Sequence, residues 1–273
     1  RIRNRILELP SDQRTPLNMW MAYEDSDNEK MEEIRARAER LVKDKDKAEK
    51  LKAWYRQLCK RPCFHDAYLD AFNNPATHLI DTDGKGVERI TEKGVVVAGK
   101  EYEVDCIVFA SGFEVGTPLE HRAGFDLEGR GGLRLSQYWA DGMRSLHGIN
   151  VHGFPNAFLV QAAQGANLIS NYPHNLSESG KTIAMTVKKA LDSGAREVEP
   201  SREAEDAWVK LILSGPGMML GSLDCTPGYY NNEGQDRGPA AKSYVGHPGG
   251  AMAFFRHIDT WRNSGTFDGL EFR

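Results

Sequence analysis

Two cations and a proline stand in a row at Lys60-Arg61-Pro62. The compact ammonium of Lys60 suits a phosphate dianion, whereas the planar guanidinium of Arg61 stays charged and can donate to two oxygens at once. Pro62 restricts the backbone directly after them. The segment therefore indicates anion binding. The alternative, which holds for any lysine or arginine, is a pair of solvated surface cations.

A second segment, residues 104–112, joins a β-branched apolar run to an exit of small residues, Val-Asp-Cys-Ile-Val-Phe-Ala-Ser-Gly. The run is typical of a buried strand. Ser111 and Gly112 project nothing larger than a hydroxymethyl group, so the backbone can approach a flat or charged ligand there. Residues 94–103 contain a glycine turn and predict a hairpin that leads into this strand. An ordinary buried strand ending in a turn is the alternative.

In this order, the segments resemble Baeyer–Villiger monooxygenases, the flavin enzymes that insert oxygen beside a carbonyl. Lys60-Arg61-Pro62 is similar to the family's lysine-arginine segment. The hairpin with its Ala-Ser-Gly exit is similar to the junction between the two dinucleotide domains of flavoprotein monooxygenases and disulfide reductases. Residues 154–159 and 165–172 resemble the family's flavin-side loop, and the resemblance runs from about Trp54 to the C-terminus.

The resemblance implies an α/β fold: a partial flavoprotein with two incomplete, Rossmann-like dinucleotide-binding domains, a helical insert and a β-meander. Residues 1–110 are expected to be the C-terminal remnant of the NADPH-binding domain, which carries the helical insert. Residues 111–273 are expected to be the C-terminal part of the FAD-binding domain. Such domains hold pyrophosphate on glycine-rich turns, which in the family precede the matched segment. We therefore expect a truncated, C-terminal portion of a longer enzyme that is inactive in isolation.

The resemblance also assigns the two cations. Arg61 is expected to be catalytic, because a fixed cation stabilises negative charge that develops on oxygen during the reaction. Lys60 is expected to contact the ribose phosphate of the nicotinamide cofactor.

Four further residues are expected to bind cofactor. Ser111 and Gly112 would let the domain junction pass close to the flavin, with Ser-Gly in place of the family's usual Thr-Gly. Asn171 and Tyr172 precede a predicted helix, where polar groups can bind the electron-rich edge of the flavin, and the matching family loop borders the substrate pocket. Tyr229 to Asn232 match a family loop that folds over NADP, with packing on a core as the alternative.

The function implied is that of an FAD- and NADPH-dependent monooxygenase that uses O2 and a small-molecule ketone and gives an ester or lactone. One alternative is a flavin monooxygenase that hydroxylates nitrogen or sulfur, which the segment at Lys60 disfavours. The other is a catalytically inactive remnant, which the missing glycine-rich turns favour. The ketone and the oligomeric state stay open.

Composition narrows the possible partners. The 273 residues are 40% hydrophobic and 27% charged, with a formal net charge of −4, which gives no reason to expect nucleic acid. No apolar run approaches the ~20 residues of a membrane span, so no membrane association is expected.

The four cysteines (Cys59, Cys63, Cys106 and Cys225) are too few for a disulfide framework, which predicts a reducing cytoplasm. Cys59, Cys63 and His65 have a poor zinc spacing, so no metal is expected. The two cysteines are interpreted as small fillers.

The patterns predict helices over about 26–44, 46–58, 178–191 and 204–213, and strands near 77–82, 87–91, 94–98, 102–110 and 158–160. The first helix is predicted from a capping box at Ser26 to Glu29. Residues 222–250 are predicted to form a long loop.

Overall fold

The computed structural model describes residues 2–57, 59–112, 118–160, 163–166, 170–215, 225–228, 231, 234–235 and 243–273. The chain divides into two compact units. The first is Arg1–Phe113 with Asp224–Tyr230, and the second is Glu114–Leu223 with Asn231–Arg273. None of the described helices combines the length and the apolar character that crossing a membrane requires.

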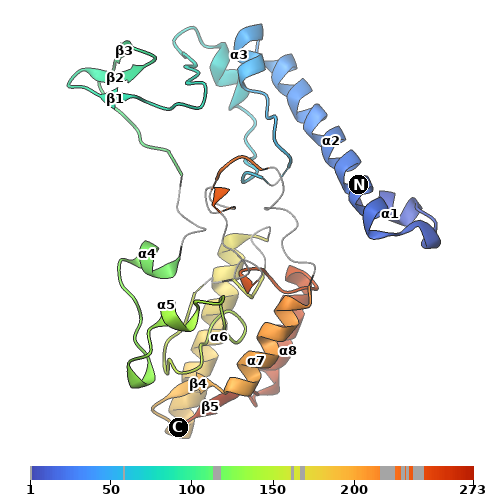
Figure 1. The fold of residues 1–273 in the computed structure, drawn as a ribbon, viewed down its shortest axis with the longest axis vertical. Helices are drawn as coiled ribbons and strands as arrows, with labels where there is room; N and C mark the ends of the chain where they lie inside the picture. The colour runs from blue at the N-terminus through green and yellow to red at the C-terminus, as the bar shows by residue number, and fades with distance from the viewer. Residues whose placement is uncertain are drawn as a thin grey trace. The chain divides into compact units, whose positions relative to one another are not determined.

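Helices open the first unit. α1 (Ile2–Glu8) packs on the long helix α2 (Pro16–Leu41), after the short 3-10 turn η1 (Ser11–Gln13) (Figure 1). Thr15 caps α2 by accepting a hydrogen bond from the Asn18 N–H at 3.2 Å.

The predicted start at Ser26 is therefore wrong. Ser26 lies inside α2, and its buried hydroxyl donates to the Ala22 carbonyl at 2.7 Å. Thr15 followed by Pro16 supplies an earlier start, and no further proline or glycine lies between Pro16 and Ser26. After α2, Asp44 caps the short helix α3 (Lys45–Lys50), and the 3-10 turn η2 (Leu69–Asn73) follows.

A three-stranded antiparallel sheet completes the described part of the first unit. Its strands are β1 (Arg89–Ile90), β2 (Gly94–Val97) and β3 (Lys100–Glu103), with β2 in the centre. The predicted hairpin is confirmed, with Val96 paired to Glu101 across its turn.

The predicted buried strand over 102–110 is wrong beyond β3. Residues 104–109 are irregular, and Val108 and Phe109 are 82% and 76% exposed. Within the described residues this run has no neighbouring strand. A lone strand would leave its backbone N–H and C=O groups unpaired, so an apolar pattern alone does not form one. The strand predicted near 77–82 is irregular as well.

The second unit is mostly helical. Its elements are α4 (Leu119–Ala123), η3 (Arg130–Gly132), α5 (Leu135–Tyr138), α6 (Tyr172–Ser193), β4 (Val198–Pro200), α7 (Arg202–Leu213), α8 (Ala251–Ser264) and β5 (Leu270–Phe272). β4 and β5 pair in antiparallel fashion. The strand predicted over 158–160 is irregular, and Val160 is 57% exposed.

The main core of this unit lies between α7 and α8. Trp208 and Ile212 of α7 pack with Phe254 and Ile258 of α8, and all four are buried. α6 packs against α8 (Figure 1).

The face that α6 buries is polar rather than apolar. Its buried residues are Asn175, Glu178, Thr182, Thr186 and Ala190, whereas the apolar side chains of Met185 and Val187 are 39% and 38% exposed. Arg262 of α8 explains the inversion, because it pairs with Glu178 at 2.6 Å and its guanidinium bonds the Glu178 carbonyl at 3.1 Å. A buried carboxylate with a buried partner replaces the expected apolar contact.

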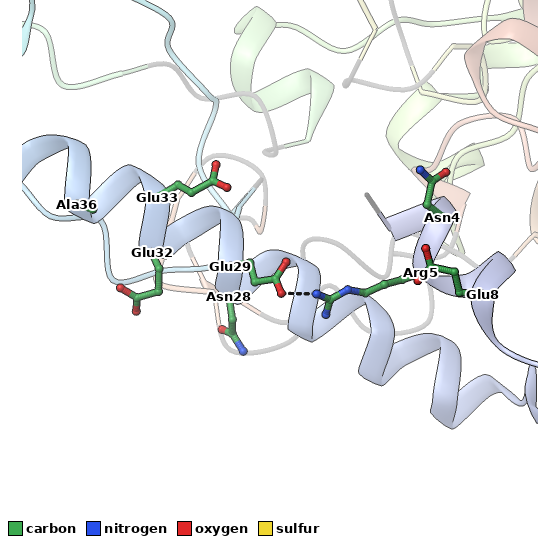
Figure 2. A pocket seen from close by; sticks show the side chains of 8 residues that line it. All are labelled: Asn4, Arg5, Glu8, Asn28, Glu29, Glu32, Glu33 and Ala36. Atoms are coloured by element: carbon green, nitrogen blue, oxygen red, sulfur yellow. Dashed lines mark hydrogen bonds and ion pairs between the residues drawn. The ribbon is translucent and has the colours of Figure 1, made fainter.

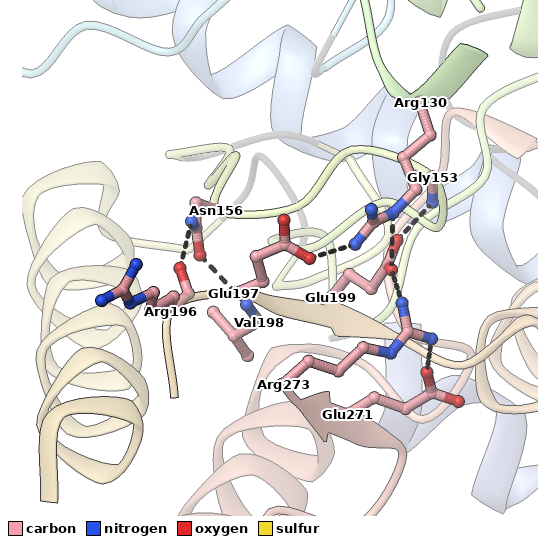
Figure 3. Close-up of polar contacts among 9 residues, drawn as sticks. All are labelled: Arg130, Gly153, Asn156, Arg196, Glu197, Val198, Glu199, Glu271 and Arg273. Carbon is pink, nitrogen blue, oxygen red and sulfur yellow. Dashed lines mark hydrogen bonds and ion pairs between the residues drawn. The ribbon is translucent and has the colours of Figure 1, made fainter. Parts of the chain in front are cut away.

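The two strands are joined to the preceding loop through Glu199 of β4 (Figure 3). This 3%-exposed carboxylate accepts from Arg130 at 3.1 Å, Arg273 at 2.6 Å and the Gly153 N–H at 2.9 Å. Burial acts to raise the pKa of Glu199, but these donors outweigh it and hold the pKa below its usual range. The Asn156 side chain adds two hydrogen bonds: it donates to the Arg196 carbonyl and accepts from the Val198 N–H.

Candidate functional site

Lys60 lies in an irregular part of the first unit and is half-buried. Its ammonium donates to the backbone carbonyl of Pro227, which is distant in sequence. Gly228 makes room for this contact, because a Cβ built there would lie 2.7 Å from Lys60 Nζ. Lys60 is therefore held against the segment 225–228 rather than extended into solvent.

A disulfide joins the same two segments. Cys59, which is 4% exposed, is bonded to Cys225, with their Cα atoms 5.4 Å apart. The interpretation of Cys59 as a small filler is thus wrong, because a partner 166 positions away is invisible to local pattern analysis. Cys63 and Cys106 are free and exposed, and the thiol of Cys63 makes a long contact of 3.7 Å with the Arg61 carbonyl.

Arg61 follows Lys60 directly and is exposed. The pair therefore presents a half-buried ammonium and an exposed guanidinium on consecutive residues. Both charge types suit an anion. The catalytic role of Arg61 stays a prediction.

Ser111 and Gly112 also belong to the first unit, and both are exposed. Gly112 adopts φ +104°, a region that favours glycine, and a Cβ built there would meet none of the described residues within 4 Å. Among the described residues, nothing therefore blocks the approach of a ligand to the Gly112 backbone. Contact with a flavin stays a prediction.

In the second unit, Gln164 fixes the start of the predicted flavin-side loop. Its side chain is fully buried and donates to the carbonyls of Met143 and Ser243 at 2.7 and 3.1 Å, while it accepts from the Ser145 hydroxyl at 2.7 Å. The Trp208 indole donates to its carbonyl at 3.0 Å. No local sequence pattern around Gln164 indicates this role, because its side-chain partners are 19 to 79 positions away.

Asn171 and Tyr172 lie at the other end of that loop, at the start of α6. The side-chain oxygen of Asn171 caps the helix by accepting from the His174 N–H at 3.0 Å. Tyr172 is 43% exposed. The positive end of the α6 dipole thus lies at an exposed amide and phenol, which suits an electron-rich ligand. Residues 167–169, together with Tyr229, Tyr230 and Asn232, lie outside the described residues.

His147 is the most perturbed titratable group among those described. Its Nε2 lies 3.1 Å from Nε2 of His257, and its ring packs edge-on against Trp208 at 4.6 Å. Burial, followed by the neighbouring His257, lowers the pKa of His147 to about 3. At neutral pH both rings are therefore uncharged, and the Nε2–H of one ring donates a hydrogen bond to the Nε2 of the other. A neutral, enclosed imidazole does not serve as an anion-binding cation.

Two hollows in the described part of the chain have linings that contain none of Lys60, Arg61, Ser111, Gly112, Asn171 and Tyr172. A groove of about 900 Å³ lies between α1 and α2 (Figure 2), lined by Asn4, Arg5, Glu8, Asn28, Glu29, Glu32, Glu33 and Ala36. Its carboxylates repel phosphate, which makes it unsuitable for a dinucleotide. A cavity of about 20 Å³ beside His147 has room for about one water. Among the described residues, no group of three or more His, Cys, Asp or Glu is placed to hold a metal ion.

Similar proteins cover nearly the whole chain. The FAD-binding monooxygenase hmp7 of Hypomyces subiculosus is 44% identical over 264 residues, which are 96% of this chain and 43% of that protein. A Baeyer–Villiger monooxygenase of Streptomyces coelicolor is 46% identical over 246 residues, which are 88% of this chain and 40% of that protein. No protein-family model matches the chain.

The fold gives the same relationship. The polycyclic ketone monooxygenase of Thermothelomyces thermophila superposes with a TM-score of 0.79 at 35% identity, over 96% of this chain and 43% of that one. The mixed helix and sheet content is that of partial domains of such a flavoprotein. The chain spans about two fifths of the length of these relatives. By sequence and by fold, it corresponds to part of a Baeyer–Villiger-type flavin monooxygenase.

Proposed function

We propose that this chain is part of an FAD- and NADPH-dependent monooxygenase that inserts one oxygen atom of O2 next to a ketone carbonyl, giving an ester or lactone. The observation that carries the proposal is the pair of cations at Lys60 and Arg61, set within a sequence 44% identical to an FAD-binding monooxygenase over 96% of its length. FAD, when bound and reduced by NADPH, would supply the activation of O2.

The chain's own residues would bind, orient and hold charge. We assign to Arg61 the stabilisation of the negative charge that develops on the ketone oxygen, because its exposed guanidinium can donate hydrogen bonds to two oxygens. Lys60 would bind the ribose phosphate of NADPH. The open backbone at Ser111 and Gly112, and the helix start at Asn171 and Tyr172, would lie against the flavin.

The domain assignment and the location form part of the same proposal. Residues 1–110 would come from the NADPH-binding domain and residues 111–273 from the FAD-binding domain. We propose a cytoplasmic enzyme, where NADPH is supplied, and cell fractionation checks this.

The protein that contains this chain, loaded with FAD, tests the function directly. We expect NADPH and O2 to be consumed in equal amounts with a ketone panel, and isotopically labelled O2 to place one labelled atom in an ester or lactone. NADPH oxidation that yields only hydrogen peroxide with every ketone would contradict the proposal. Labelled products from amines or sulfides alone would favour the hydroxylating alternative.

Replacing Lys60 with alanine should raise the KM for NADPH about tenfold, as expected for loss of a bond to a charged group, and should change the KM for NADH little. The ammonium has a partner only where a 2′-phosphate is present. Steady-state kinetics with both nucleotides make the comparison. Lys85→Ala, which removes an 80%-exposed lysine of the same unit, is the control, and equal effects on both nucleotides would assign Lys60 to structure.

Changes at Asn171 and Tyr172 should alter which ketones are accepted or on which side of the carbonyl oxygen enters. Asn171→Asp keeps the oxygen that caps α6 but removes the amide donor, and Tyr172→Ala opens the exposed surface beside it. One methylene of misfit costs about 1–3 kcal/mol, so product ratios should change about tenfold. Lys188→Ala, on an exposed face of α6, is the control. Unchanged rates and ratios across the panel would place this helix start outside the pocket.

A further inference from the structure

A disulfide and a hydrogen bond connect Cys59 and Lys60 to the segment 225–228. The Cys59–Cys225 disulfide and the hydrogen bond from Lys60 to the Pro227 carbonyl connect neighbouring residues on both sides. The two sides are 166 positions apart in sequence. A covalent bond across such a span removes chain entropy that the hydrogen bond at Lys60 would otherwise have to offset. The disulfide therefore favours the position of the Pro227 carbonyl at Lys60.

We propose that Cys59–Cys225 is a redox modification site whose substrate is a small thiol, and that its reduction releases the Lys60 ammonium from the Pro227 carbonyl. In the oxidised chain the Lys60 ammonium donates its hydrogen bond to the Pro227 carbonyl. In the reduced chain the ammonium is available to an anion. The part of this proposal that names NADPH as the anion rests on the proposed function.

The exposure of the two cysteine residues favours one direction of the exchange. Cys59 is 4% exposed, whereas Cys225 is half-buried, so a thiolate reaches Sγ of Cys225 more easily. That attack forms a mixed disulfide at Cys225 and expels Cys59 as a thiolate. The second thiol of a dithiol then breaks the mixed disulfide. The dithiol becomes a cyclic disulfide, and its two protons end on Cys59 and Cys225.

The location of the bond gives the exchange a consequence at the proposed site. Lys60 directly follows Cys59, and Gly228 leaves space that the lysine stem fills. Once the disulfide is reduced, the hydrogen bond from Lys60 to the Pro227 carbonyl loses the covalent bond beside it, and we expect the ammonium to leave that partner. An ammonium that is half-buried without an acceptor favours binding of a phosphate. Thiol reduction should therefore increase affinity for nucleotides with a 2′-phosphate.

The experiment measures cysteine alkylation and lysine acylation by mass spectrometry on the full chain, with and without dithiothreitol. Without reductant, iodoacetamide should label Cys63 and Cys106 but not Cys59 and Cys225. After reduction all four should be labelled, and acylation of Lys60, measured relative to Lys85, should become about tenfold faster, the loss expected for one bond to a charged group. Labelling of Cys59 and Cys225 without reductant, or an unchanged Lys60 rate after reduction, would overturn the proposal.

Two variants test whether the Cys59–Cys225 bond causes the change at Lys60, and one nucleotide tests whether Lys60 then binds a 2′-phosphate. Cys225→Ser should show fast Lys60 acylation without reductant, whereas Cys63→Ser, which removes an exposed free thiol four positions along from Cys59, should behave as the parent chain. Adenosine 2′,5′-bisphosphate should protect Lys60 from acylation only after reduction. If acylation responds to reduction but this nucleotide never protects Lys60, the redox site stands and the nucleotide role within the proposed function fails.

Discussion

Replacing Arg61 with alanine is expected to lower ester or lactone formation about 10²–10³-fold, the usual loss for one donor to a developing oxyanion. Reduction of the flavin by NADPH should persist, because that step develops no negative charge on the ketone oxygen. The guanidinium of Arg61 lies on an exposed residue, where a ligand can approach it. Product formation measured alongside NADPH consumption separates the two effects.

Two further variants make the Arg61 result specific. Arg61→Lys keeps the charge but loses the two-pronged geometry, so its rate should fall between those of the parent and the alanine variant. Arg37→Ala removes a 42%-exposed arginine of the same unit and should leave the rate unchanged. Ester formation at the parent rate in Arg61→Ala would remove this residue from the chemistry.

Local patterns predicted the parts of the fold that depend on local contacts. The hairpin of β2 and β3 forms where a glycine turn separates two short strands, and α7 forms over the predicted residues with Ser201 as its cap. Both signals lie within a few residues of the element that they specify.

The errors arise where distant residues decide the structure. The polar face of α6 is buried because Arg262 of α8 pairs with Glu178, and no periodicity within α6 reports that partner. Residues 104–109 have the pattern of a strand but no strand beside them among the described residues. Hydrophobic pattern sets which face is preferred, while pairing and ion partners set whether it is buried.

The same division applies to the candidate site. Lys60 and Arg61 stand out in the sequence because their types and order suit anions. The partners of Lys60 and Cys59 cannot be recognised in the same way, because Pro227 and Cys225 are far from them in sequence. The buried role of Gln164 is equally hidden, since its acceptors Met143 and Ser243 lie on either side of it at long sequence distance. The sequence thus identifies the two cations, and the structure shows which groups hold Lys60 in place.

Acidification should destabilise the second unit well before its carboxylates titrate, because of His147. Its pKa is about 3 in the folded chain against 6.5 for the free side chain. Between these values the unfolded chain binds more protons than the folded one, so the stabilisation is complete above pH 6.5 and is lost as the pH falls toward 3. The slope is about 1.4 kcal/mol per pH unit, which amounts to about 5 kcal/mol over the full range. Burial lowers the pKa of His247 and His257 as well, which adds to the slope in the same direction.

Denaturant unfolding of the chain between pH 5 and pH 6.5 isolates this effect (about 2 kcal/mol over that window). The carboxyl groups of Glu178 and Glu199, whose pKa values lie below 4.5, stay ionised there and lose their own contribution only at lower pH. His147→Asn removes the imidazole at a position with φ +57°, which asparagine tolerates better than most residues. We expect that variant to be less stable at neutral pH, because the bond to His257 is lost, but to show a flatter pH dependence. His78→Asn, which removes an exposed histidine of the first unit, should keep the parent slope. If His147→Asn retains that slope too, the enclosed imidazole is not its source.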